Sequence, residues 1–417
     1  MIEFRGYRRD DGSIGVRNHV AVIPTSVTAS ALARELSRQG GDGVRATPHQ
    51  MGAHQPAPAR EQTERVLAGI GRNPNVGGVL LVELGTEAID VDVLADRIAE
   101  TGNPVETLSI REAGGTKGAL EAGASLVEGL RDAADGARRE SADAAELIFG
   151  VECGGSDATS GFAANPAVGN ACDRLIEAGG TVCFSETPEF IGAEHLLAER
   201  CVDAETRERL LDRVEMRERM AQLMGVDLRG AQPTPGNQEG GLTTIEEKSL
   251  GAISKGGTTP VRGMVDYAET LPTGGGLVLM DTPGYDVESV VGKVAGGAQV
   301  IAFTTGRGST TGNPIAPVIK VTGNPRTWRK LASNIDVNAS TVLSGESLDA
   351  VGERVFERLL EVASGRRTQA EHRRLEEFAI NEIQPQELVG LREAAVHLGE
   401  KAVHLGEEAV GPDGGAS

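Results

Sequence analysis

The sequence predicts an α/β protein of two domains, the first a doubly wound parallel (Rossmann-like) sheet and the second a larger α/β domain. Three observations support this fold class. The chain of 417 residues is too long for a single hydrophobic core. Aromatic residues make up only 3% of it, so Ala, Val, Leu and Ile must build the core, as in buried parallel strands covered by helices. Its 56 glycines cluster in short loops between apolar runs, which is typical of alternating strands and helices.

The first domain is predicted over residues 1–137, where four apolar runs are each followed by a segment of helical spacing. The expected strands are 19–24, 43–47, 78–84 and 105–110, and the expected helices are 29–39, 60–70, 91–100 and 116–134. Four successive strand–helix units indicate a parallel, doubly wound sheet. Right-handed crossovers would bring the loops after the strands to one edge, where ligands usually bind.

The second domain is predicted over residues 146–383, after a polar and acidic segment, 138–145, that is expected to be a linker. Its expected strands are 146–151, 181–185, 276–280, 300–304 and 319–322. A Gly/Pro-rich stretch at 225–241 is expected to be a long loop over a site. Residues 384–417 are predicted to form an acidic helical tail.

Charge and composition exclude several classes of function. The formal net charge is −20, and only seven of the 41 basic residues are Lys. This balance favours a halophilic protein, because concentrated salt screens self-repulsion, and the alternative is an ordinary acidic protein. Nucleic acid is a poor partner, since phosphates need a basic face. No apolar run of about 18 residues predicts a membrane span. The N-terminus has no apolar signal-peptide core, so the cytoplasm is expected.

The spacing of the cysteines and glycines argues against three further features: a disulfide framework, a zinc ribbon and a nucleotide site. The four cysteines show no CxxC pattern, which argues against a disulfide framework or a zinc ribbon. No GxGxxG follows the first strand and no P-loop lysine motif occurs, so no nucleotide cofactor is expected.

A glycine turn, ECGGSD at Glu152–Asp157, directly follows the first strand of the second domain. Its glycines let the backbone approach a ligand, and their amides can form an anion cradle. The alternative is a tight strand-to-helix turn in which a polar side chain caps the helix. The candidate substrate-binding residues of this turn are Cys153, Gly154, Gly155, Ser156 and Asp157.

Acidic residues and a histidine follow the next strand. Glu186 and Glu189 lie in the segment SETPE, and His195 comes soon after. Carboxylates and an imidazole so close together can bind a divalent ion or perform acid–base chemistry. The alternative is a capped helix with acids in its first turn, which offset the helix macrodipole.

Two lysines, Lys248 and Lys255, stand out in a chain so poor in lysine. A lysine with a depressed pKa can remove a proton next to a carboxylate, and the alternative is a surface lysine paired with a nearby Glu. Asn237 lies in the glycine-rich stretch before them.

The loops after strands 276–280 and 300–304, DTPGYD and TTGRGS, would lie on the ligand edge of the same sheet. In the second loop, Thr305, Gly306, Arg307 and Gly308 combine the glycines and the guanidinium of an anion site. Arg17 lies in an N-terminal turn before a strand, and it is a further candidate for a bidentate contact with a carboxylate.

Seven motifs occur in order along roughly residues 6–380: GYRRDDGSIGVRN, ECGGSD, ANPAVG, SETPEFIGAEHLL, PGNQEGGLTTIEEKSLG, DTPGYD and TTGRGS. Together they resemble the altronate/galactarate dehydratase family, which includes the large subunits of sulfolactate sulfo-lyase. The resemblance implies a hydro-lyase that removes water from an aldonate or aldarate, such as altronate or galactarate, to give a 2-keto-3-deoxy acid. The alternatives are a large subunit of the sulfo-lyase type and a non-catalytic paralogue that binds a sugar acid.

Within this resemblance, Lys248 or His195 would be the base, and Glu186 and Glu189 would be metal ligands or acid partners. The glycine turn, Lys255, Asn237 and the Thr305–Gly308 loop would hold the substrate, with Arg307 on a carboxylate.

Two departures from the family pattern shape the expected cofactor and partner. Relatives carry a small N-terminal SAF domain before the point where this chain begins, so a separate small SAF-domain subunit and a homo- or hetero-oligomer are expected. Relatives usually have cysteines where this chain has Thr28, Ala53 and Thr86, so soft ligands are lost. A divalent metal, Fe²⁺ or alternatively Mn²⁺ or Mg²⁺, would then be bound by oxygen and nitrogen ligands. The candidate ligands are His49, Glu87 and Glu186.

Overall fold

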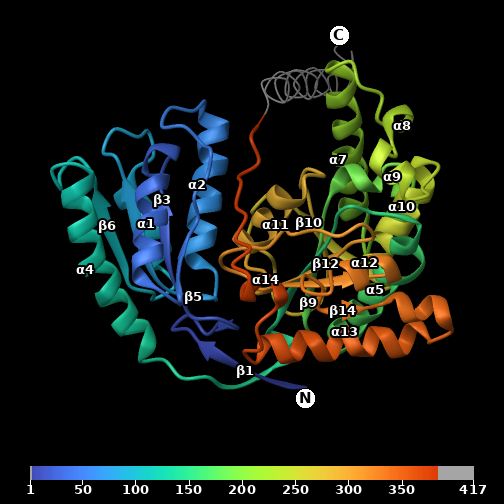
Figure 1. Cartoon of the computed structure of the whole chain (residues 1–417). Helices are drawn as coiled ribbons and strands as arrows, with labels where there is room; N and C mark the ends of the chain where they lie inside the picture. The colour runs from blue at the N-terminus through green and yellow to red at the C-terminus, as the bar shows by residue number, and fades with distance from the viewer. Residues whose placement is uncertain (1, 384–417) are drawn as a thin grey trace, which may run out of the picture.

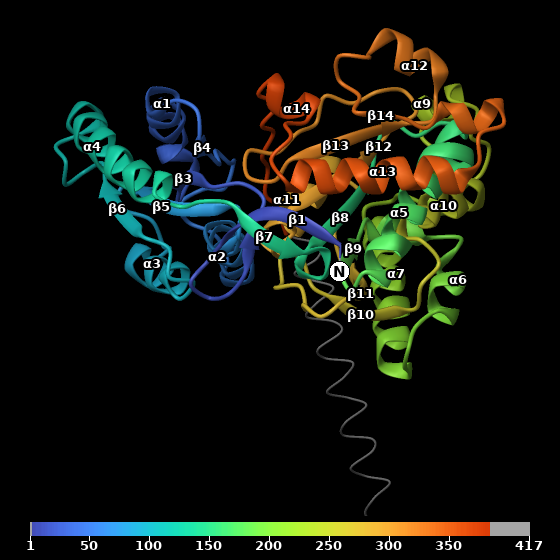
Figure 2. The same ribbon diagram turned by 90° about the horizontal axis from the view of Figure 1, so that it is seen from below.

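The computed structural model describes residues 2–383, and the predicted acidic tail at 384–417 lies outside the described residues. The chain contains two parallel sheets, one in each predicted domain, and a small antiparallel sheet between them (Figures 1 and 2). None of the described helices is long and apolar enough to cross a membrane.

The first domain is a four-stranded parallel sheet in the order β4–β3–β5–β6. Its strands are β3 (His19–Pro24), β4 (Val44–Ala46), β5 (Val76–Glu83) and β6 (Val105–Ser109), and its helices are α1 (Ser30–Gly40), α2 (Ala57–Arg72), α3 (Val91–Ala99) and α4 (Thr116–Asp135). Apolar side chains of α1 and α4 cover one face of the sheet, and those of α2 and α3 cover the other. The predicted doubly wound arrangement is therefore confirmed.

The segment expected to be a linker contains a strand. β7 (Glu140–Asp143) pairs antiparallel with β1 (Glu3–Arg8), which pairs in turn with β2 (Ile14–Gly15). The polar side chains of β7 hid its strand character, because only Ala142 of its four residues is buried. The connection between the domains is thus hydrogen-bonded to the N-terminal strand.

The second domain is a seven-stranded parallel sheet in the order β10–β11–β9–β8–β12–β13–β14. The strands are β8 (Ile148–Cys153), β9 (Thr181–Phe184), β10 (Val261–Val265), β11 (Gly276–Met280), β12 (Val300–Thr304), β13 (Val318–Thr322) and β14 (Val337–Asn338). Sequence reasoning found five of these strands and missed β10 and β14, one interrupted by Arg and Gly and the other only two residues long.

Two helix layers cover this sheet. α5 (Asn165–Glu177) and α13 (Leu348–Ala363) pack on one face, while α11 (Asp286–Ala295) packs on the other face and against α2 of the first domain. The remaining helices of the second domain include α6 (Glu194–Glu199), α7 (Ala204–Leu223), α8 (Leu228–Ala231), α9 (Pro235–Glu239), α10 (Ile245–Ile253), α12 (Pro325–Lys330) and α14 (Gln369–His372). The Gly/Pro-rich stretch at 225–241, expected to be a loop, therefore contains two short helices.

The C-terminal part of the described chain returns to the first domain (Figure 1). The amide of Gln50 donates to the carbonyl of Ile380 at 2.6 Å, and that of Gln62 donates to the carbonyl of Asn381 at 2.6 Å. One apolar cluster also runs from α2 and α3 through α11 to the second sheet. The two domains therefore share one buried face.

Candidate active site

The carboxyl ends of β8, β9 and β11 meet at one edge of the second sheet, beside α10 and the start of α11. The chain leaves these strands at Cys153, Phe184 and Met280. Parallel strands deliver their following loops to the same edge, so residues far apart in sequence converge there. Four carboxylates, three lysines and a cysteine meet at this edge, and we call this group the buried cluster: Glu152, Cys153, Glu186, Glu189, Lys248, Lys255, Asp286 and Lys293.

Lys255 lies at the centre of the buried cluster and is fully buried. Its Nζ is 2.7 Å from Oε2 of Glu186, 3.0 Å from Sγ of Cys153 and 3.8 Å from Oε2 of Glu189. Burial alone would lower the pKa of Lys255, but the surrounding acidic side chains, Glu186 and Glu189 among them, outweigh it and hold the pKa above its usual value. Lys255 is therefore an ammonium that joins three side chains.

The thiol of Cys153 faces the same carboxylates. Its Sγ donates to Oε2 of Glu189 at 3.0 Å, and its backbone N–H donates to Oε2 of Glu186 at 3.1 Å. Burial and the negative charges of Glu186 and Glu189 raise the pKa of this thiol well above its usual value. Cys153 is thus a neutral donor here, not a thiolate.

Lys248 forms the outer part of the buried cluster. Its Nζ is 3.1 Å from Oε1 of Glu189 and 3.1 Å from Oε1 of Gln232. Burial raises the pKa of Glu189, but Lys248 and Lys255 outweigh it and lower the pKa to about 2. Lys248 also lines a cavity of about 260 Å³ together with Ser156 and Phe162. This ammonium is therefore the cluster's cation nearest to a small-molecule space.

Lys293 binds the far side of Glu152, and both side chains are fully buried. Its Nζ forms a very short contact with Oε2 of Glu152 and also donates to the carbonyl of Val151 at 3.0 Å. The ammonium leaves Oε1 of Glu152 untouched. In a buried pair of this kind, the attraction between the two groups and their further hydrogen bonds must offset the cost of desolvation.

Two carboxylate oxygens in the buried cluster lack a partner. Oε1 of Glu152 and Oε1 of Glu186 are buried and have no hydrogen bond to any described residue. Oxygens of Glu152, Glu186 and Asp286 lie within 4.8 Å of one another, as do ligand atoms of Cys153, Glu186 and Glu189. Burial and the charges of Glu186 and Glu189 raise the pKa of Asp286 to about 7. Unpaired buried oxygens of this kind are costly, so a proton or a cation is expected between them.

Two glycines bring the loops close together. A Cβ on Gly154 would lie 2.1 Å from Oδ2 of Asp286, and a Cβ on Gly306 would lie 2.1 Å from Cγ of Asp157. Asp157 is a local cap: Oδ1 accepts from the backbone N–H of Ser160 at 3.1 Å and Oδ2 accepts from the amide of Asn324 at 2.7 Å. Its carboxylate is therefore used within the chain, as the capping alternative predicted.

Family comparisons agree with this architecture. A family model described as D-galactarate dehydratase/altronate hydrolase, second domain, matches residues 6–135, and one described as D-galactarate/altronate dehydratase, C-terminal, matches residues 144–386. The chain belongs to the D-galactarate/altronate dehydratase family.

Three relatives can each be aligned with most of this chain. The (2R)-sulfolactate sulfo-lyase subunit beta of Chromohalobacter salexigens is 42% identical over 383 residues, which are 91% of this chain and 97% of that subunit. Altronate dehydratase of Bacillus subtilis is 33% identical over 90% of this chain and 77% of that protein. Galactarate dehydratase (L-threo-forming) of Escherichia coli is 36% identical over 87% of this chain and 73% of that protein. The family member described here is accordingly an enzyme of the lyase class.

The structure brings together only some of the predicted site residues. Lys248, Lys255, Glu186, Glu189 and Cys153 meet in the buried cluster, as described above. Other predicted residues surround its outer side: Gly154, Gly155, Ser156, Asn237, Thr305, Gly306, Arg307 and Gly308. Asn237 donates to the carbonyl of Ser156 at 2.9 Å, and the half-exposed guanidinium of Arg307 is 3.4 Å from Glu239.

His195 and Arg17 do not join the cluster. His195 is exposed on α6, whereas the cluster is buried. Arg17 does hold a carboxylate in a bidentate contact, but the carboxylate is that of Glu371, at 2.6 and 2.8 Å. Its remaining N–H groups donate to the carbonyls of Val16, Val362 and Arg366. Arg17 therefore joins the N-terminal and C-terminal segments and has no group left for a substrate.

The structure does not bring His49 and Glu87 to Glu186. Both ring nitrogens of His49 are used: Nε2 is 2.8 Å from the carbonyl of Pro24, and Nδ1 accepts from the N–H of Met51 at 3.2 Å. Glu87 accepts from the backbone N–H groups of Leu84, Gly85 and Thr86 at 2.7–2.9 Å and from the hydroxyl of Ser26. These two first-domain side chains are thus committed to their own loops.

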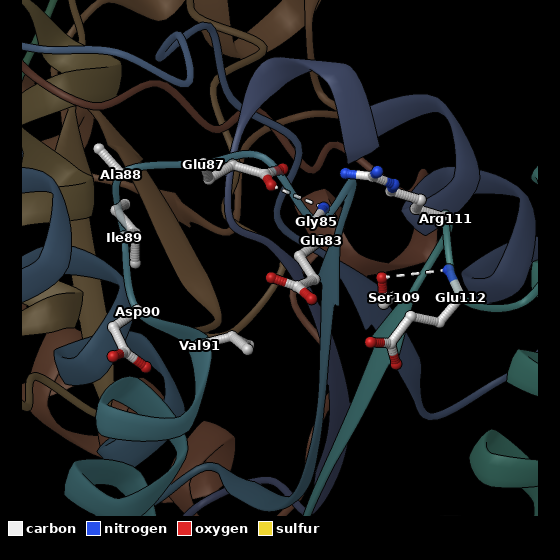
Figure 3. A pocket seen from close by; sticks show the side chains of 10 residues that line it. All are labelled: Glu83, Gly85, Glu87, Ala88, Ile89, Asp90, Val91, Ser109, Arg111 and Glu112. Atoms are coloured by element: carbon white, nitrogen blue, oxygen red, sulfur yellow. Dashed lines mark hydrogen bonds between the residues drawn. The ribbon is translucent and has the colours of Figure 1, made fainter.

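Glu87 lines a cavity of about 700 Å³ at the carboxyl end of β5 and β6 (Figure 3). Thr28 and Ala53 lie at the same edge: Thr28 is 2.6 Å from the hydroxyl of Ser26, and the carbonyl of Ala53 accepts from Ala88. The cysteine-to-Thr and cysteine-to-Ala departures expected from the family pattern therefore fall near this cavity and not in the buried cluster.

Sequence reasoning missed three residues of the buried cluster: Glu152, Asp286 and Lys293. Glu152 lies in the motif ECGGSD, which was interpreted through its glycines, and Asp286 lies in DTPGYD, which was interpreted through its place after a strand. Lys293 gave the clearest overlooked signal, since it is one of only seven lysines and it interrupts the apolar run of α11. A lone lysine in an apolar helix is usually held by a buried carboxylate.

Proposed function

We propose that this protein is a lyase that eliminates the C3 substituent of a 2-hydroxy acid, with a divalent metal ion held by the buried cluster. The single observation that carries this proposal is the pair of unpaired carboxylate oxygens on Glu152 and Glu186, next to three ammonium groups. In such an elimination a base removes the C2 proton, and its electrons form the C2–C3 double bond. The C3 group leaves with its bonding pair, and the enol becomes a 2-keto acid.

The ligand set fits a hard or borderline divalent ion. Oε1 of Glu152, Oε1 of Glu186 and a carboxylate oxygen of Asp286 would hold it, because oxygen ligands suit Mg²⁺, Mn²⁺ and Fe²⁺. The alternative set with Cys153 already surrounds the ammonium of Lys255, which takes the place a cation would need. When bound, the metal would supply electrophilic stabilisation of the charge that develops on the substrate carboxylate.

Lys248 is proposed as the general acid or as a cation for a substrate carboxylate. Burial lowers the pKa of Lys248, but Glu189 outweighs it and the pKa is raised overall. The side chain is thus an ammonium at neutral pH, a form that can give a proton to a leaving hydroxyl or attract an anion but cannot accept a proton. This favours an acid role over the base role expected from the sequence.

For the substrate, a sugar acid such as altronate or galactarate follows from the family as a whole, and 3-sulfolactate is the second candidate. Two observations favour the second candidate. The sulfo-lyase subunit beta is matched over 97% of its length. The polar side chains in the wall of the 260 Å³ cavity are also largely paired within the chain, as for Asp157 and Asn165, while Phe162, Leu242 and Leu250 are apolar. A polyhydroxy substrate needs more free hydrogen-bond partners than such a wall provides.

An assay for 2-keto acids across aldonates, aldarates and 3-sulfolactate tests the proposal, with released sulfite measured in parallel. Chelation should abolish turnover, and Fe²⁺, Mn²⁺ or Mg²⁺ should restore it. Product from sugar acids without sulfite selects the dehydratase, and sulfite with pyruvate selects the sulfo-lyase. No 2-keto acid from any of these substrates, with metal present, would overturn the proposed function.

The partner and cellular setting are also proposed. Because one relative is named as a subunit beta, we propose that this chain works with a separate small subunit of the SAF type in a hetero-oligomer, and the assay should be run with and without it. A cytoplasmic location remains a proposal, and so does adaptation to salt, which the net charge of −20 supports. Activity that rises between low and molar KCl would support the salt adaptation.

A further inference from the structure

Glu186 has a strained backbone at the point where the chain leaves β9. Its φ is 72°, in the left-handed region, although it is not a glycine. This conformation is uncommon for a residue with a long side chain and persists only where neighbouring groups hold it. Because Glu186 is fully buried, its strained backbone also decides where its carboxylate points.

Thr282, which follows β11, holds this turn from the neighbouring loop. The N–H of Glu186 donates to Oγ1 of Thr282 at 2.9 Å, and the N–H of Thr187 donates to the carbonyl of Thr282 at 3.3 Å. Thr282 is fully buried, and the contacts of its hydroxyl are the N–H of Glu186, Oγ of Ser289 and the carbonyl of Pro283, to which it donates at 3.1 Å. It therefore touches the backbone of Glu186 without entering the ligand set.

The hydroxyl of Thr282 is oriented by a chain that ends on Lys293. Oγ1 of Thr282 is 2.9 Å from Oγ of Ser289, which is 2.9 Å from Oγ of Ser185. Nζ of Lys293 donates to Ser185 at 2.6 Å and to Ser289 at 3.2 Å. An ammonium has three protons and accepts none, so with four acceptors around it the two serines can only accept from it, Ser289 at the longest distance, and each directs its own proton onward. The same ammonium binds Glu152.

The network of Lys293, Ser289 and Thr282 therefore contacts both Glu152 and Glu186. Lys293 binds Oε2 of Glu152 directly, and through Ser289 and Thr282 it supports the backbone of Glu186. The oxygens that this network leaves free, Oε1 of each residue, are the two without a partner. Hydroxyls that fix a turn without touching the ligand atoms are well suited to positioning.

We propose that Thr282 is a positioning residue: its hydroxyl, held by the Lys293–Ser289 chain, keeps Glu186 in the left-handed turn that aims its free oxygen at that of Glu152. The expected loss of turnover rests on the proposed function. The expected change in the backbone of Glu186 does not.

The test compares Thr282→Val with Thr282→Ser. Valine keeps the shape but removes the acceptor for the N–H of Glu186, whereas serine keeps the hydroxyl. Outer partners of metal ligands typically change affinity or activity by about 10- to 100-fold. We expect Thr282→Val to lower kcat and the affinity for Mn²⁺ by about that factor while KM changes little, and Thr282→Ser to recover most of both.

A matched control is Thr63→Val on α2. Thr63 is also fully buried, and its hydroxyl donates to the carbonyl of Ala59 at 2.9 Å, but it lies in the first domain. It should lose stability of the same order as Thr282→Val and leave kcat and Mn²⁺ affinity unchanged. Equal effects of the two variants on kcat would mean that Thr282 contributes only stability.

A crystal structure of Thr282→Val separates this inference from the proposed function. Glu186 is expected to leave the left-handed region, or its carboxylate to turn away from Glu152. If the φ of Glu186 stays positive and the carboxylate is unmoved, the inference is overturned even if the wild type is an active lyase. If Thr282→Val does not fold, Ser289→Ala is the substitute, since it breaks the same chain one step earlier. A wild type without turnover on any substrate would overturn the proposed function, and the geometry of Glu186 in the variant would still decide the inference.

Discussion

The two parallel sheets have the same kind of carboxyl edge but use their polar groups differently. At the edge of the first sheet, Glu87 gives its oxygens to three backbone N–H groups and a hydroxyl, and His49 uses both ring nitrogens. At the edge of the second sheet, Glu152 and Glu186 each keep one oxygen free. The first edge has the larger cavity, about 700 Å³ against about 260 Å³. Available ligand atoms, and not cavity size, therefore point to the site.

The sharpest test of this contrast removes one carboxylate from each edge. Burial and the charge of Glu152 raise the pKa of Glu186 well above its usual value. Glu186→Gln should lower turnover by about 10²- to 10⁴-fold, because an amide can neither exchange a proton nor become the carboxylate ligand that a divalent ion needs. Glu87→Gln should leave the turnover of the folded protein unchanged, since the carboxylate only closes its own loop. Turnover of both variants is measured at matched folded fractions. Comparable losses would mean that the first edge takes part in the reaction.

Two buried lysines of the second domain allow a comparison of stability. Lys255→Met should lower the free energy of unfolding by about 3–5 kcal/mol, because it strands the fully buried Glu186 without its counterion. Lys320→Met should be neutral or stabilising, since Nζ of Lys320 is buried without a hydrogen-bond partner in residues 2–383, and burial lowers its pKa to about 8. Urea unfolding measures both. A larger loss for Lys320→Met would contradict the account of the cluster.

Arg307, on the outer side of the second edge, tests where the substrate enters. Its guanidinium is half-exposed and pairs only loosely with the exposed Glu239. If it binds a substrate carboxylate, Arg307→Ala should raise KM by about tenfold or more with little change in kcat, as expected for a hydrogen bond to a charged group. Arg219→Ala, on the exposed face of α7, is the control. An unchanged KM would remove Arg307 from the substrate site.

The last expected effect is the pH dependence of stability at His19. Burial, with repulsion from Arg45 and Arg17, lowers the pKa of His19 from 6.5 to about 3. The folded protein thus resists a proton that the unfolded chain accepts. The contribution is fully present above pH 6.5 and is lost as the pH falls towards 3, by at most about 1.4 kcal/mol per pH unit. His19→Gln should flatten this slope in urea titrations between pH 6.5 and pH 4. An unchanged slope would show that His19 is not responsible.

Much of the fold was predictable because the signals for it are local. The apolar run at 19–24 is β3 to the residue, and the helical spacing at 116–134 is α4 with one further residue. The missed strands had no such signal: β7 carries four polar or small residues, and it is a strand only because β1 lies beside it. Of the predicted site residues, Cys153, Glu186, Glu189, Lys248 and Lys255 converge beside the strand ends of the second sheet, and their individual roles stay predictions.

The sequence by itself determined the class of the protein, a parallel α/β chain of this dehydratase family, because periodicity and motif order are properties of neighbouring residues. Only the tertiary structure decided which candidates are free to react. Arg17 binds Glu371, 354 residues away, and His49 bonds within its own loop, whereas Lys293 binds Glu152 across 141 residues. A polar group's availability depends on every partner that folding brings to it, and sequence spacing carries no record of those partners.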